Sequence, residues 1–240
     1  MSNENLSIWS QVEKTAPQNV KPVTNGGRTY SSINPTSQKK KATTMFGAYG
    51  IGWGVEPETE RYDYKEFAGG TILVIYRAVM FYKYNGETGR LPISANEKLA
   101  YVTNGGKGYL KIDDEAEKKV RTNAVTKGLS ELGFNADIFL GQWEDAEYKA
   151  MRDMEEGLAR AENFEVAQKK GIEELRIWMN KESETLAVMK NANSITMVVN
   201  NIEQKFRTKA QLLKISQELF DSMIGKLHKA ANDAIQNLNK

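Results

Sequence analysis

Four acidic side chains stand close together near the middle of the chain, at Asp113, Asp114, Glu115 and Glu117. Carboxylates at this spacing could bind a divalent cation, as the active site of a metal-dependent nuclease does. The same spacing suits the first turn of a helix, where carboxylates meet the positive end of the helix dipole. We expect the helix-capping role, and a nuclease that uses Asp113, Asp114 and Glu115 is kept as an alternative hypothesis.

Other catalytic or cofactor sites have little support in the sequence. His228 is the only histidine and the chain has no cysteine, so a histidine-based triad or a zinc site would lack ligands. The glycine-rich segments 47–54 (GAYGIGWG) and 104–109 (NGGKGY) do not have the residue order of a dinucleotide-binding loop or a P-loop. We therefore expect no enzymatic activity, no cofactor and no bound metal.

A helix is expected over residues 116–132. At about 100° per residue, one broad face is apolar and contains Ala116, Val120, Ala124, Val125, Gly128 and Leu132. The opposite face carries hydrogen-bond donors, namely Lys119, Asn123, Thr126 and Ser130. Such donors could hold a phosphodiester backbone, and the alternative is an ordinary solvated face.

Arg121 is an exception on this helix because it projects into the apolar side. A charge there needs a carboxylate, a neighbouring subunit or a ligand phosphate as its partner. The helix should stop at Gly133, and the apolar segment that follows it is strand-like.

Around this helix, a mixed α/β domain is expected over residues 5–148, in which glycine pairs separate short strands. Residues 28–34 alternate as a strand does, and a short helix should run from Pro35 to Phe46, with Lys40 and Lys41 facing away from the core. Segment 70–89 is apolar on both faces, which is typical of a central strand covered by a helix, and Asn85-Gly86 should end it in a turn.

Residues 149–240 have few glycines and show helical spacing of apolar residues. Two long amphipathic helices are expected, with a break and a new N-cap at Asn193-Ser194. Their apolar stripes need partners, which could be each other, the first domain or another chain.

Composition sets the broad class of the protein. The 240 residues are 40% hydrophobic and 27% charged, with a formal net charge of +2. No signal peptide and no apolar window of about 20 residues is evident, so we expect a cytoplasmic protein that does not enter a membrane. The net charge does not by itself indicate nucleic-acid binding.

Two blocks and a tail segment resemble the Rad-fifty-two type of single-strand DNA annealing proteins, together with the Erf-like phage annealing proteins and the mitochondrial genome maintenance recombination proteins. Residues 45–55 (MFGAYGIGWGV) are similar to the family's helix-to-strand junction. Residues 118–134 (KKVRTNAVTKGLSELGF) are similar to its long helix, and 137–148 to the segment that closes the annealing domain. The chain departs from the family after Gly128-Leu129, because Ser130 and Glu131 replace further basic residues.

The resemblance covers residues 5–148 and implies an α+β fold in which a curved antiparallel β-sheet packs on a long helix. The helical region 149–240 is expected to serve oligomerisation or partner binding. The resemblance implies ATP-independent binding of single-stranded DNA and annealing of complementary strands in recombination and repair, through an annealed duplex intermediate. It also implies a homo-oligomer, either a ring or a helical filament, which works beside a single-strand binding protein and an exonuclease. A phage or prophage origin, and hence a bacterial host cytoplasm, is a further implication.

The expected DNA contacts combine the family helix with other basic positions. They are Arg28, Lys39, Lys40, Lys41, Lys107, Lys111, Lys119, Arg121, Asn123, Thr126, Lys127 and Ser130. Annealing requires that base edges stay open, so we expect phosphate contacts rather than base stacking. Tyr30, Trp53 and Tyr109 are expected to be packing residues, although Tyr109 beside Lys107 could stack at the edge of a groove. A helical structural or adaptor protein is the remaining alternative, and it would leave Lys119 and Arg121 without a role.

Overall fold

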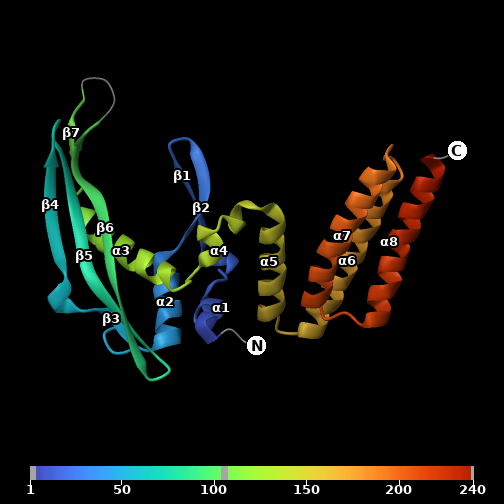
Figure 1. Cartoon of the computed structure of the whole chain (residues 1–240), viewed down its shortest axis with the longest axis horizontal. Helices are drawn as coiled ribbons and strands as arrows, with labels where there is room; N and C mark the ends of the chain where they lie inside the picture. Colours follow the sequence, from blue (N-terminus) through green and yellow to red (C-terminus); the bar gives the residue numbers. More distant parts are fainter. Residues whose placement is uncertain (1–3, 104–107, 239–240) are drawn as a thin grey trace. The chain divides into compact units, whose positions relative to one another are not determined.

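The computed structural model describes residues 4–103 and 108–238, and it divides into two compact units, Met1–Ala146 and Glu147–Lys240 (Figure 1). The chain is α+β: antiparallel sheets occupy the first unit and helices make up the second. The expected fold class is thus confirmed in its composition of elements and in the antiparallel pairing of its strands.

The main sheet of the first unit is built around one long hairpin. Its strands are β3 (Trp53–Val55), β4 (Arg61–Phe67), β5 (Thr71–Tyr84), β6 (Glu87–Val102) and β7 (Leu110–Ile112). Their order is β3-β5-β6-β7, with β4 also pairing with β5, and all pairs are antiparallel. The β5–β6 hairpin turns at Asn85 (φ 50°) and Gly86 (φ 83°), as predicted.

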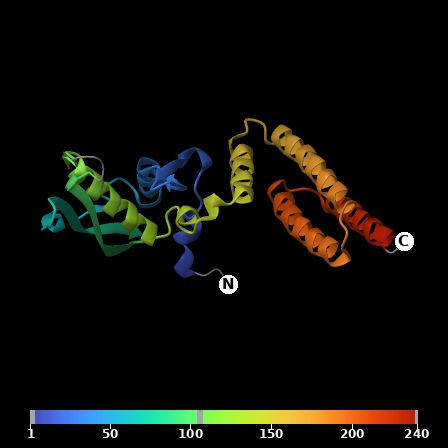
Figure 2. The same cartoon turned by 90° about the horizontal axis from the view of Figure 1, so that it is seen from above.

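One face of this sheet is covered by helix α3 (Ala116–Glu131), which crosses β5 and β6 (Figure 2). The apolar face predicted for this helix is buried, apart from the half-buried Leu132. Gly128 allows the close approach, because a Cβ at this position would lie 2.5 Å from Ile93 Cγ2. The sheet side of the core includes Val74, Tyr76, Ala78, Met80, Ile93 and Ala95.

The remaining N-terminal elements also follow local signals. Helix α2 (Pro35–Phe46) is capped by Asn34, whose Oδ1 accepts a hydrogen bond from the Thr36 N–H at 3.0 Å, and it ends at Gly47 (φ 98°). A separate hairpin joins β1 (Val20–Asn25) to β2 (Arg28–Ile33). The short elements before and between them are η1 (Glu4–Leu6), α1 (Trp9–Val12), η2 (Pro17–Asn19) and η3 (Pro57–Thr59).

The prediction of a strand-like segment after α3 is wrong. The chain forms α4 (Ala136–Phe139) and η4 (Gln142–Glu144), because residues with positive φ turn it repeatedly, at Gly133, Asn135 and Gly141. The buried Asp137 carboxylate fixes this path. It accepts hydrogen bonds from Thr15 N (2.6 Å), Thr15 Oγ1 (2.5 Å) and Trp143 Nε1 (2.8 Å), and so ties the N-terminal segment to the end of the unit.

The second unit has four helices where two were predicted: α5 (Ala146–Arg160), α6 (Phe164–Leu186), α7 (Ala192–Leu212) and α8 (Gln217–Leu238). Asn163 and Asn191 cap α6 and α7, so the predicted cap at Asn193-Ser194 is wrong and those residues lie in the first turn of α7. α7 ends at Leu212, and Lys214 (φ 49°) lies in the connection to α8. The helices share a core that includes Leu175, Leu186, Ile195, Phe206 and Leu227.

Within residues 4–103 and 108–238, no helix combines the length and the apolar character needed to cross a bilayer.

Candidate nucleic-acid interface

The donor-bearing face of α3 is engaged in contacts within the protein. Lys119 Nζ lies 2.7 Å from Asp113 Oδ2, and Asn123 Nδ2 donates to Glu97 Oε1 at 2.5 Å. The Ser130 hydroxyl donates to the backbone oxygen of Lys127 at 2.7 Å, while Thr126 is half-buried. The Asp113 carboxylate therefore offsets the charge of Lys119, and the Glu97 carboxylate accepts the hydrogen bond of the Asn123 amide. This face of α3 carries less uncompensated positive charge than the sequence suggested.

Arg121 has the carboxylate partner that its position demanded. Its Nε and Nη2 donate to the two Glu60 oxygens at 3.0 and 3.1 Å, and Nη2 also reaches the Tyr49 hydroxyl at 3.3 Å. The pair ties α3 to the residue just before β4. Burial, and then the positive charge of Arg121, lower the pKa of Lys39 on α2. Two of the predicted DNA contacts, Lys39 and Arg121, thus lie on helices that contact each other.

Removing the Glu60 charge should make the protein less stable in a pH-dependent way. The hydrogen bonds from Arg121 hold the pKa of Glu60 below its ordinary value of 4.5. A carboxyl group whose pKa is lowered by folding stabilises the folded state at pH values above its ordinary pKa. This contribution is lost as the pH falls through the folded-state pKa. We expect Glu60→Gln to lower the free energy of unfolding at pH 7 and to differ progressively less from wild type as pH falls below about 4.5.

Urea unfolding measured at several pH values checks this expectation. The exposed neighbour Glu58 offers the control Glu58→Gln, which should stay close to wild type throughout. A Glu60→Gln deficit that is the same at pH 3 and pH 7 would contradict the ionic role of the pair.

The other basic residues predicted to contact DNA are spread over several elements. Lys41 is half-buried and its Nζ donates to the backbone oxygens of Val12 and Lys14, both at 2.7 Å, so the prediction that it faces away from the core is wrong. Arg28, Lys40 and Lys127 are exposed, but they lie on β2, α2 and α3 respectively. Lys111 lies on β7, and Lys107 is outside the described residues.

The acidic run before α3 is held by hydrogen bonds and ion pairs. Asp113 Oδ1 accepts from the Glu115 N–H at 3.2 Å, Glu115 pairs with Lys118 at 2.9 Å, and Glu117 accepts from the Tyr64 hydroxyl. The ion pair with Lys119 lowers the pKa of Asp113. In the part of the chain that the structure describes, no group of three or more acidic, histidine or cysteine side chains could hold a metal ion.

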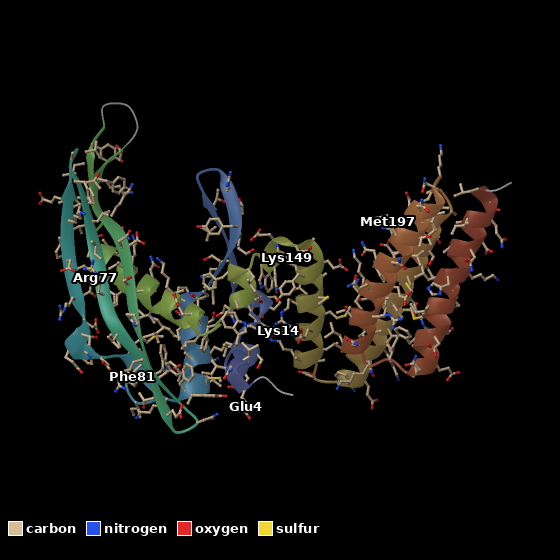
Figure 3. All side chains as sticks on the ribbon, in the orientation of Figure 1. Glu4, Lys14, Arg77, Phe81, Lys149 and Met197 are labelled. Atoms are coloured by element: carbon tan, nitrogen blue, oxygen red, sulfur yellow. The ribbon has the colours of Figure 1, made fainter. Side chains whose placement is uncertain are left out.

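A cationic surface lies elsewhere, on the face of the main sheet opposite α3, which we call the outer face. Residues directly opposite each other on antiparallel strands share a face. Arg77 lies between Arg61 on β4 and Ser94 on β6, and Leu73 lies between Lys65 and Lys98. Arg77 and Phe81 are labelled on β5 in Figure 3. Two acidic residues, Asp63 on β4 and Glu56 just after β3, lie on this face. Seven basic residues occupy it: Arg61, Lys65, Arg77, Lys83, Arg90, Lys98 and Lys111.

Most of these cations are not neutralised. Arg77 pairs with Asp63, and Arg90 pairs with Glu56 at 2.7 Å. None of the other five lies within 4.0 Å of a carboxylate in residues 4–103 and 108–238. A row of half-buried apolar side chains on β5 runs between the basic residues of this face: Leu73, Ile75, Val79 and Phe81. From Thr71 to Lys83 the face extends about 40 Å at 3.3 Å per residue, which is long enough to follow an extended polymer.

Only Lys111 of this set was predicted from the sequence. The strand over residues 70–89 was expected, but its odd-numbered positions were read as a second apolar face. Strand pairing places the cations of β4 and β6 on that face. The register of this pairing cannot be predicted from the pattern of a single strand. An available signal was the alternation of Arg61, Asp63 and Lys65, which places three charges on one side of β4.

The comparisons with known proteins assign no relative, since no protein-family model and no curated protein matches the chain.

Proposed function

We propose that this protein binds single-stranded DNA on the outer face of its main sheet and anneals complementary strands without ATP, as an oligomer. The observation that carries the proposal is the excess of seven basic over two acidic residues on that face. The resemblance of residues 45–55 and 118–134 to annealing proteins agrees with it. In the structure these segments form the α2–β3 junction and α3.

The chemistry of the face suits a protein that presents a strand for pairing. Lysine and arginine bind phosphate oxygens without reading sequence, and each contact releases counterions from the strand. Ser94 and Asn96 on β6 add short donors beside the cations. A strand held along its backbone keeps most base edges free for a complementary strand, whereas a protein that enclosed every base would prevent pairing.

The two edges of the sheet support assembly into an oligomer. β4 and β7 lie at opposite sides of the sheet, and β7 exposes Leu110 and Ile112, at 57% and 65% of their surface. An unpaired edge is a template for another strand. Pairing of β7 on one copy with β4 on the next is a head-to-tail contact, which gives a ring if it closes and a filament if it does not. Either assembly repeats the cationic face along one DNA strand.

An annealing assay tests the proposal. Complementary oligonucleotides are mixed with the protein, without ATP, in magnesium and in EDTA, and duplex formation is followed by fluorescence energy transfer. We expect annealing faster than without protein in both buffers. Degradation of the strands that requires magnesium would support a nuclease instead, and absence of DNA binding at low salt would favour an adaptor.

A further inference from the structure

Two aromatic rings stand at one end of the outer face, each beside lysines. Lys65 Nζ lies 5.2 Å from the centre of the Phe67 ring, and Lys98 Nζ lies 5.2 Å from the centre of the Tyr101 ring. Lys111 Nζ is 6.0 Å from the same Tyr101 ring. The structure thus places cations and π-faces together at one end of the surface, a combination found where proteins hold single strands.

The strand register puts the two rings in one row across the sheet. Phe67 on β4 lies opposite Thr71, and Tyr101 on β6 lies opposite Lys111. Because Ile72 pairs with Ala100, Thr71 lies beside Tyr101 and separates the two aromatic residues. The two rings therefore extend from strands that lie two inter-strand spacings, or about 10 Å, apart.

The rings are accessible and are not needed to fill the core. Phe67 is 45% exposed and Tyr101 is half-exposed, and both lie outside the hydrophobic cluster between the sheet and α3. Lysine side chains are long and mobile, so each ammonium can exchange its ring for a phosphate and leave the ring to a base.

We infer that Phe67 and Tyr101 each stack an unpaired base, so that this end of the outer face selects single strands over duplex. The inference rests on the proposed function and deepens it, because cations alone bind both forms of DNA. Bases inside a duplex are already stacked on both sides and offer no face to the rings. Stacking at this one end still leaves the bases along the rest of the face open for pairing.

The test compares binding of a fluorescent 20-nucleotide oligo-dT and of a 20-base-pair duplex to the full chain. Phe67→Leu combined with Tyr101→Leu should weaken single-strand binding about ten-fold for each ring lost. Duplex affinity and the salt dependence of binding should not change, because all the cations remain. Tyr30→Leu, which removes an exposed tyrosine from β2, is the matched control and should bind as wild type.

Tyr101→Phe and Phe67→Tyr should restore single-strand binding, which separates stacking from any loss of fold; far-UV circular dichroism checks the fold directly. The stacking inference would be overturned if the leucine variants bound the oligonucleotide as the wild type does, with the same salt dependence, or if they lost affinity equally for single strands and duplex. Either result would leave the proposed function standing. Failure of the wild-type protein to bind the oligonucleotide at low salt would overturn both.

Discussion

Replacing Lys65, Lys83 and Lys98 with glutamine should weaken binding of single-stranded DNA on the order of 100-fold at 0.1 M salt. For single strands each phosphate contact contributes about 0.7 to the slope of log affinity against log salt concentration. If the electrostatic contribution vanishes near 1 M salt, three contacts account for about two orders of magnitude at 0.1 M, and the slope should fall by about 2. Fluorescence anisotropy of an oligo-dT measured over a salt series gives both quantities.

The chain provides a matched control for this triple variant. Arg28, Lys40 and Lys127 are exposed cations on β2, α2 and α3, away from the outer face. Their replacement by glutamine removes the same net charge. We expect at most a few-fold effect, because only the long-range field of the protein changes.

The comparison decides between two surfaces. A large loss in the control triple, with little loss in the outer-face triple, would place the DNA on the side of α2, α3 and the β1–β2 hairpin, as the sequence first suggested. Equal losses in both variants would mean that net charge alone drives binding and that neither surface is a site.

How much of the structure could be predicted depends on how far apart in sequence the determining residues lie. The ends of α2 follow from Asn34 and Gly47 alone, since a cap and a left-handed glycine act within one turn. The buried face of α3 follows from its own periodicity. That Arg121 needs a partner could also be predicted. The identity of the partner could not, because Glu60 is 61 residues away.

Periodicity was misleading in the second unit for a definite reason. Phe206, Leu213, Phe220, Leu227 and Ala234 are each seven residues apart, so the pattern continues across the connection between α7 and α8. The break is visible only in the backbone, where Lys214 has φ 49°. The outer face was missed for a similar reason: Lys65, Lys83 and Lys98 share a surface only because β4, β5 and β6 pair in one particular register.

The largest expected effect on stability is at Asp137. Asp137→Ala should lower the free energy of unfolding of the first unit by about 3–5 kcal/mol, because it leaves buried donors without an acceptor. The donors are the Thr15 N–H, the Thr15 hydroxyl and the Trp143 indole N–H. Asp137, Thr15 and Trp143 are 3%, 1% and 4% exposed, so the donors lie away from bulk solvent.

The measurement is urea unfolding followed by tryptophan fluorescence in a Trp178→Phe background. Three of the four tryptophans then remain, all in the first unit, so the signal reports that unit alone. Asp114→Ala, at an exposed position before α3, should stay within about 0.5 kcal/mol of the background. Asp137→Asn should fall between the two, because the amide keeps one acceptor but directs an N–H group towards a donor. An Asp137→Ala variant as stable as Asp114→Ala would show that the N-terminal segment is held mainly by apolar packing, with Val12 in the core as its anchor.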